Sequence, residues 1–170
     1  GGSVNMVRVQ CLAGMRPREV RLMRWEEIRW ESNCAVYAPR RHKVEHYGRD
    51  RWIILVAEAL ELLGERETEG YVFKTRLDGP YSDQGYRQEL QRACERIGLR
   101  RIGPADIRRA SATYARCVGG AERAQRLLGH ASTAMTEEYF GLGWMDQAGA
   151  VDELVDRVWT LREDQFGEES

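Results

Sequence analysis

The sequence predicts an α+β fold that is mostly helical, with a small three-stranded antiparallel sheet near its N-terminal end. Three short stretches rich in β-branched and aromatic residues lie within residues 27–55. Through most of the remaining chain, apolar residues recur at the spacings of three and four that are typical of helices. The chain of 170 residues corresponds to about one folded domain.

Two helices are expected before the sheet. Residues 1–3 are Gly-Gly-Ser, which we interpret as an expression scar. Val4–Ala13 is expected to form the end of a first helix, which Gly14 terminates. Pro17 opens a second helix that reaches about Arg24, because a proline in the first turn removes no internal hydrogen bond.

The predicted strands are Glu27–Trp30, Ala35–Ala38 and Arg51–Leu55. The segment Pro39–Asp50 then becomes the hairpin between the second and third strands. This hairpin is strongly basic, since it contains Arg40, Arg41, His42, Lys43, His46 and Arg49.

After the sheet the pattern turns helical. The predicted helices are Val56–Arg66, Ser82–Ile97, Pro104–Val118 and Ala121–Leu128, with Gly119 and Gly120 as a break between the last two. A short helix is expected from Ser132 or Thr133 through Tyr139. An apolar stripe on an acidic helix follows over residues 151–161.

The distribution of charge along the chain is uneven, although the formal net charge is only −1. Residues 87–126 carry a local balance of +6, and residues 144–170 carry −6. The average therefore does not exclude nucleic acid as a partner, because a basic segment can contact phosphates on its own.

The four cysteines lack the paired spacing of a zinc site or of a disulfide framework, and we expect buried thiols. The sequence shows neither an apolar run long enough to span a membrane nor a signal peptide. We therefore expect a cytoplasmic protein without a membrane partner.

Taken singly, the candidate functional residues have ordinary structural explanations. Arg16 and Arg108 resemble solvated surface arginines, His130 a helix cap and Tyr139 a half-buried core aromatic. Lys43 is more informative, because the chain contains only two lysines and uses arginine elsewhere. A lysine kept within a basic hairpin suggests a need for a titratable point charge.

As a set, these residues resemble the catalytic domain of the tyrosine recombinases, the phage-integrase family. Lys43 follows Arg16 by 27 residues, Arg108 follows after 65 more, His130 after 22 and Tyr139 after 9. The stretches that carry the resemblance are Gly-Met-Arg-Pro-Arg-Glu at 14–19, Ile-Arg-Arg-Ala-Ser-Ala-Thr at 107–113, Leu-Leu-Gly-His-Ala-Ser at 127–132 and Thr-Glu-Glu-Tyr at 136–139. The implied catalytic domain covers residues 4–145, and residues 146–170 form an acidic C-terminal helix or tail.

The resemblance implies cleavage and rejoining of DNA through a 3′-phosphotyrosyl intermediate, with no cofactor and no metal. Tyr139 would be the nucleophile, and Arg16 and Arg108 would bind the phosphate. Lys43 would protonate the departing 5′ oxygen, and His130 would donate a hydrogen bond to the phosphate or orient the tyrosine. The supporting residue would be Glu19, and the DNA-binding residues would be Arg40, Arg41, His42, Arg49 and Arg109.

One position departs from the family pattern. The family usually has a histidine three residues before the second arginine, and here that residue is Ala105. This keeps open a second interpretation, a DNA-binding regulator or accessory module of the same fold with impaired catalysis. The implied partners are double-stranded DNA and further copies of the parent protein in a tetrameric synapse. Residues 146–162 would either make that contact or fold back on their own domain.

Overall fold

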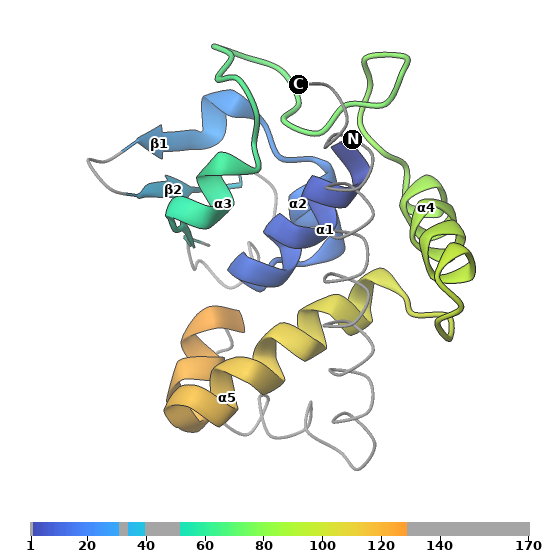
Figure 1. The fold of residues 1–170 in the computed structure, drawn as a ribbon. Helices are drawn as coiled ribbons and strands as arrows, with labels where there is room; N and C mark the ends of the chain where they lie inside the picture. Colours follow the sequence, from blue (N-terminus) through green and yellow to red (C-terminus); the bar gives the residue numbers. More distant parts are fainter. Residues whose placement is uncertain (1, 31–33, 40–51, 129–170) are drawn as a thin grey trace, which may run out of the picture.

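The computed structural model describes residues 2–30, 34–39 and 52–128 and has a mixed α and β fold, as predicted. Its elements are α1 (Gly2–Ala13), α2 (Pro17–Arg21), a 3₁₀ turn (Trp25–Glu27), β1 (Ile28–Trp30), β2 (Ala35–Tyr37), β3 (Ile53–Leu55), α3 (Ala57–Glu61), α4 (Asp83–Arg96) and α5 (Pro104–Leu128). Helix α1 lies at the centre of the fold, with the sheet and α3 on one side and α5 below it (Figure 1). Helix α4 flanks α2 and the beginning of α5.

The core forms around the buried face of α1. Its buried residues are Met6, Val9, Gln10 and Ala13, which recur at helical spacing. The helix ends at Gly14, whose φ of 58° lies in the left-handed region that glycine adopts without steric cost. The Met15 N–H donates to the Gln10 carbonyl at 3.1 Å, and the Gly14 N–H donates to the Cys11 carbonyl at 3.4 Å. These two bonds form a Schellman motif, and the predicted end of the helix is confirmed.

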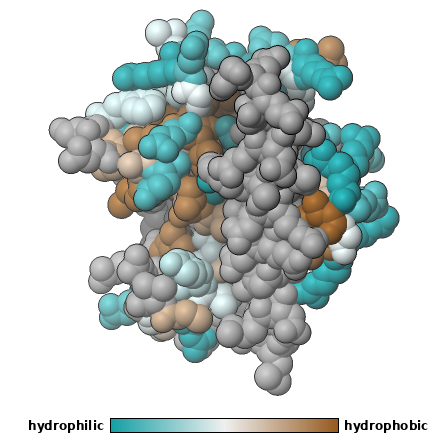
Figure 2. All heavy atoms as spheres, viewed as in Figure 1, coloured by the Kyte–Doolittle hydropathy of each residue, from teal (hydrophilic) through white to brown (hydrophobic). Residues whose placement is uncertain are grey.

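The three strands form an antiparallel sheet in the order β1-β2-β3, as predicted. Ile28 pairs with Tyr37, and Val36 pairs with Ile54. Side chains alternate between the two faces of the sheet, so that Tyr37 and Leu55 are buried while Ile54 is 64% exposed. Figure 2 shows apolar residues around the sheet and α3, and hydrophilic residues over α4.

Two predicted helices are longer than the observed ones. Helix α2 ends at Arg21 rather than near Arg24, because the chain that follows it pairs with a distant loop. The Val72 N–H donates to the Met23 carbonyl at 2.9 Å, and the Trp25 N–H donates to the Gly70 carbonyl at 3.0 Å. Helix α3 ends at Glu61 rather than Arg66, and Gly64 then takes a φ of 85°.

The later helices follow the sequence closely, with one correction. Ser82 caps α4, since its hydroxyl accepts a hydrogen bond from the Gly85 N–H at 2.9 Å. The predicted break at Gly119-Gly120 is present as a change of direction rather than as an end of the helix, because α5 runs from Pro104 to Leu128 through it. Gly120 has a φ of 74° within it, and the last part of α5 points in a different direction from the first (Figure 1).

Several sequence predictions fall outside the described residues, namely the basic hairpin after Pro39, the short helix ending at Tyr139 and the acidic C-terminal helix. The prediction of four buried thiols is confirmed for Cys94 alone, since Cys11 and Cys34 are half-buried and Cys117 is exposed on α5. Within the described ranges, no helix is long and apolar enough to cross a membrane.

Candidate active site

Arg16 is held at the N-terminus of α2 by Glu19. The guanidinium Nη1 of Arg16 lies 2.8 Å from Oε1 of Glu19, and its backbone N–H donates to Oε2 at 2.6 Å. One carboxylate thus binds both the main chain and the side chain of the same residue. The Glu19 side chain is only 3% exposed, whereas that of Arg16 is 20% exposed. The supporting contact expected between these two residues is therefore present, with the arginine on the solvent side.

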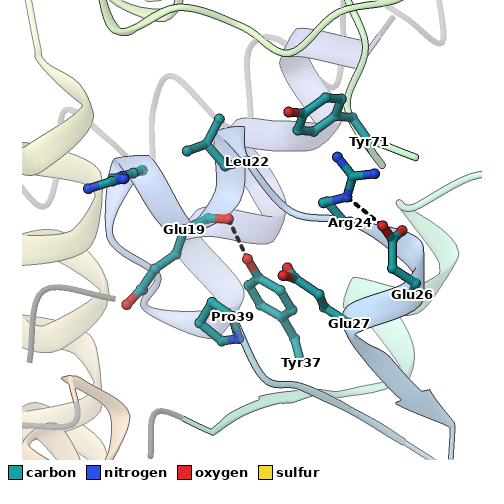
Figure 3. Close-up of a pocket in the computed structure, with 9 residues that line it drawn as sticks. Glu19, Leu22, Arg24, Glu26, Glu27, Tyr37, Pro39 and Tyr71 are labelled. Carbon is teal, nitrogen blue, oxygen red and sulfur yellow. Dashed lines mark hydrogen bonds and ion pairs between the residues drawn. The ribbon is translucent and has the colours of Figure 1, made fainter. Parts of the chain in front are cut away.

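Glu19 is in turn tied to the sheet. The hydroxyl of Tyr37 in β2 donates to the Glu19 backbone carbonyl at 3.1 Å (Figure 3). Burial of Tyr37, reinforced by the negative charges of Glu27 and Glu19, raises its pKa, so the hydroxyl stays protonated and acts as a donor. The sheet therefore fixes the helix that carries Arg16.

Arg108 lies in α5 and is only 3% exposed. Its Nη1 donates to the Gly14 carbonyl at 2.5 Å, and its Nη2 donates to the Leu128 carbonyl at 2.7 Å. Gly14 precedes Arg16 by two residues, and Leu128 precedes His130 by two. Arg108 thus joins the turn before the first candidate arginine to the part of the chain that leads to the candidate histidine.

The two carbonyl groups also provide electrostatic support for the buried cation. An arginine cannot escape burial by losing its proton, because the guanidinium stays protonated in proteins. Desolvation of the guanidinium must therefore be offset by polar partners. The Gly14 carbonyl follows the C-terminus of α1, where the helix dipole is negative and favours a cation.

Close packing brings the turn at Gly14 against α5. A Cβ atom on Gly14 would meet Cγ of Leu127 at 2.6 Å, so only glycine fits between the turn and this helix. The Ser111 hydroxyl in α5 donates to the Cys11 carbonyl near the end of α1 at 2.5 Å. The two helices are thus joined at Leu127 and at Ser111, in addition to the bond from Arg108 to the Gly14 carbonyl.

Arg109 directly follows Arg108 in α5, and Ala105 precedes Arg108 by three residues, about one helical turn. The Nη1 of Arg109 lies 3.1 Å from Oδ1 of Asp106, whose Oδ2 accepts a hydrogen bond from the Gly103 N–H at the start of the helix. Arg109, predicted to contact DNA, is therefore partnered within its own helix in this structure. Ala105 is exposed on the first turn of α5 and offers no group that exchanges protons.

Of the predicted site residues, the structure pairs Arg16 with Glu19 and binds Arg108 to the turn two residues before Arg16. Arg109 is bound to Asp106 within α5. The remaining predicted site residues lie outside the described ranges, namely Arg40, Arg41, His42, Lys43, Arg49, His130 and Tyr139. The second lysine of the chain, Lys74, has a different role. Its Nζ lies 2.7 Å from Glu67 and 3.6 Å from Asp78, and the hydrogen bond to Glu67 raises its pKa.

A separate pocket of about 480 Å³ lies between α2, the sheet and the loop at Tyr71 (Figure 3). Its charged lining residues include Arg24 and Glu26, which form an ion pair at 2.5 Å, and Tyr71 lies under the Arg24 guanidinium at 4.8 Å. Neither Arg16 nor Arg108 lines this pocket. Glu19, which binds Arg16, does line it, so the pocket adjoins the site of the two arginines. Among the described residues, no group of His, Cys, Asp and Glu side chains is arranged to hold a metal ion.

Sequence reasoning missed one buried polar residue at the site, Gln10. Its side-chain amide bonds to the Met15 and Pro104 carbonyls and to the Tyr86 hydroxyl. The signal was present, because Gln10 occupies a core-facing position between Val9 and Ala13 on α1.

The mixed fold and the bond that joins the elements carrying Arg16 and Arg108 agree with the family that the sequence of this protein itself indicates. Its sequence matches the phage integrase family over residues 3–142, and the chain belongs to that family. Comparison with curated protein sequences gives no match.

Solved recombinase structures show the same fold. The chain is similar to the XerH site-specific recombinase in a post-cleavage complex with palindromic difH substrate, with a TM-score of 0.65 and 20% identity over 88% of this chain and 45% of that chain. For the pre-cleavage complex of XerH with difH the TM-score is 0.63, at 20% identity over 79% of this chain and 41% of that chain. XerA recombinase gives 0.62 and 16% identity over 95% of this chain and 61% of that chain. The chain therefore spans between 41% and 61% of the length of these recombinases.

Proposed function

We propose that this chain is the catalytic domain of a site-specific DNA recombinase or integrase that cleaves and rejoins DNA through a 3′-phosphotyrosyl intermediate. The observation that carries the proposal is the bond from buried Arg108 to the Gly14 carbonyl, two residues from Arg16. It brings together two elements that carry the fork-shaped cations suited to a phosphate. Membership of the phage integrase family supports the same conclusion.

In the proposed reaction, the Tyr139 hydroxyl oxygen attacks the scissile phosphorus and the bond from phosphorus to the 5′ oxygen breaks. Arg16 and Arg108 stabilise the charge that develops on the non-bridging oxygens. Lys43 gives its proton to the departing 5′ oxygen, and His130 donates a hydrogen bond to the phosphate. Attack by a 5′ hydroxyl on the phosphotyrosine reverses these steps and rejoins the strand. The arginines supply the positive charge, so the proposal includes no metal step.

The proton of Tyr139 needs an acceptor other than residue 105, because alanine cannot take it. We assign that proton to His130 or to water, and we expect slow cleavage as a consequence. The exposed methyl group of Ala105 also favours a second candidate function, a DNA-binding accessory module of the same fold. The two functions differ in one respect that is easily measured, the covalent attachment of Tyr139 to DNA.

The proposed partners are double-stranded DNA and further copies of the parent recombinase, assembled as a tetramer on paired sites through residues 146–162. We place this activity in the cytoplasm. Because phosphate contacts dominate such binding, the isolated domain is expected to bind DNA weakly and with a steep dependence on salt concentration.

The test is a trapping assay with a pool of DNA duplexes that have randomised flanks and one 5′-bridging phosphorothiolate linkage. Cleavage at this linkage releases a 5′ thiol, a poor nucleophile for rejoining, so a covalent adduct accumulates. The expected result is an adduct that survives denaturation and is absent with Tyr139→Phe. DNA binding without an adduct would reject the catalytic function in favour of the accessory module.

A further inference from the structure

Gln10 is fully buried on the core face of α1, and its side-chain amide makes three hydrogen bonds, one to the turn after α1 and two to the helices α5 and α4. The Nε2 donates to the Met15 carbonyl at 3.2 Å and to the Pro104 carbonyl at 2.8 Å. The Oε1 accepts a bond from the Tyr86 hydroxyl at 2.5 Å. A buried amide with this set of partners is held in a single orientation, since a flip would place its oxygen against two carbonyl oxygens.

The hydroxyl of Tyr86 fixes that orientation. Burial raises the pKa of Tyr86, so its oxygen keeps the proton and that proton needs an acceptor. The Oε1 of Gln10 provides the acceptor, which leaves the Nε2 group for the two carbonyls. Tyr86 in α4 thereby sets the orientation of the Gln10 side-chain amide in α1.

The two carbonyl partners lie next to the candidate phosphate-binding residues. Met15 directly precedes Arg16, and Pro104 lies four residues, about one helical turn, before Arg108. Arg108 itself binds the Gly14 carbonyl, one residue before Met15. The contacts therefore close a ring from Gln10 through the α1–α2 turn to Arg108, and back along α5 to Pro104.

We infer that Gln10 is a positioning residue that sets the distance and orientation between the guanidinium groups of Arg16 and Arg108 for binding one phosphate group. This inference rests on the proposed function only in that the two arginines bind phosphate. Gln10 acts through the main chain of the turn and of the first turn of α5, and it does not touch the phosphate.

Removal of the amide would release this ring. Methionine has nearly the shape of glutamine but donates no hydrogen bond, so Gln10→Met leaves the buried Met15 and Pro104 carbonyls without this partner. The turn at Met15 then relaxes toward another donor or toward water and carries Arg16 with it. Displacement of a reacting group by about 1 Å costs on the order of 100-fold in rate.

The matched control is Asn5→Leu. Asn5 lies on the same helix, and its Nδ2 donates to the Leu62 carbonyl at 3.0 Å, a distant backbone partner away from both arginines. Both substitutions replace a carboxamide by an apolar group of similar shape. They differ in whether the lost bond leads to the candidate phosphate site.

The first measurement is the rise in melting temperature that inorganic phosphate produces, compared with chloride at equal ionic strength. A ligand that binds only the folded state stabilises it, so this rise reports the phosphate site without requiring catalysis. We expect the rise in Gln10→Met to fall to the level of Arg16→Ala, and that of Asn5→Leu to stay at the wild-type level. An unchanged rise in Gln10→Met overturns the inference.

The second measurement is the single-turnover rate of adduct formation, which we expect to fall at least tenfold in Gln10→Met and less than threefold in Asn5→Leu. If Gln10→Met does not fold, Tyr86→Phe tests the same inference, because it removes only the hydroxyl that orients the amide. Its phosphate-induced rise must then be smaller than that of wild type, and an equal rise overturns the inference. A wild-type chain that forms no adduct but shows the phosphate effects would reject the proposed function and leave the role of Gln10 intact.

Discussion

The turn between α1 and α2 is expected to reject any side chain at Gly14. Alanine at a φ of 58° costs about 1–2 kcal/mol, because its Cβ approaches the following carbonyl. The added Cβ would also lie 2.6 Å from Cγ of Leu127, and such overpacking costs about 1–3 kcal/mol more. We therefore expect Gly14→Ala to lower the free energy of unfolding by about 3 kcal/mol and the melting temperature by about 10 °C.

Thermal and urea unfolding of Gly14→Ala beside Gly64→Ala measures the two contributions separately. Gly64 has a φ of 85°, but a Cβ added there would meet no atom within 4 Å, so Gly64→Ala carries the backbone cost alone. In a Leu127→Ala background, the clash disappears and the cost of Gly14→Ala should approach that of Gly64→Ala. Equal losses for Gly14→Ala and Gly64→Ala in the native background would refute the argument from close packing.

Three other predictions concern the site. Arg108→Lys should abolish adduct formation and lower the free energy of unfolding by about 3–5 kcal/mol in urea titrations, because a single ammonium cannot replace the two Nη groups that bind the Gly14 and Leu128 carbonyls separately; retention of native stability would contradict this. Lys43→Ala should slow cleavage of an ordinary phosphodiester much more than cleavage of a 5′-bridging phosphorothiolate. A thiol has a pKa of about 8.5, so the 5′ sulfur leaves as a thiolate and needs no proton from Lys43. Equal slowing of both substrates would exclude the role of Lys43 as the acid. The pKa of Tyr37 is raised in the folded state, so its contribution to stability is complete below the unfolded pKa of about 10 and is lost as the pH rises further. Tyr37→Phe should therefore flatten the alkaline decline in melting temperature. An unchanged decline would contradict the raised pKa of Tyr37.

Local signals in the sequence are sufficient for much of the fold. Gly14, Pro17 and Ser82 mark helix boundaries through interactions within a few residues, and the structure confirms all three. The strands are predicted from short runs of β-branched and aromatic residues, and the observed burial alternates along them. These features depend on backbone geometry and on side-chain period, both of which a short window of sequence contains.

Other features depend on partners far along the chain. Helix α2 stops early because Met23 and Trp25 bond to residues near position 71, and no pattern within α2 announces that pairing. At Gly120 the helix α5 changes direction without ending, and the sequence alone does not decide between a bend and an end. Propensity predicts that a glycine weakens a helix, and tertiary contacts decide whether the helix ends there.

The site itself has a signal in the sequence that is stronger than the individual residues suggest. In α5 the buried positions include Pro104, Ile107, Arg108, Ser111 and Ala112, which repeat with the spacing of a core-facing stripe. Arg108 therefore lies in the middle of a core-facing stripe, and this position marks it as a buried residue rather than a surface charge.

Helix α1 has the same arrangement, with Gln10 four residues after Met6 and three before Ala13. A polar side chain in a core-facing stripe must find buried partners, and here the two stripes face each other across the contact between α1 and α5. Periodicity thus predicts that Gln10 and Arg108 are buried and bonded. It does not predict which carbonyls they bind, because the Met15, Gly14 and Pro104 carbonyls come together only when the turn after α1 packs against α5.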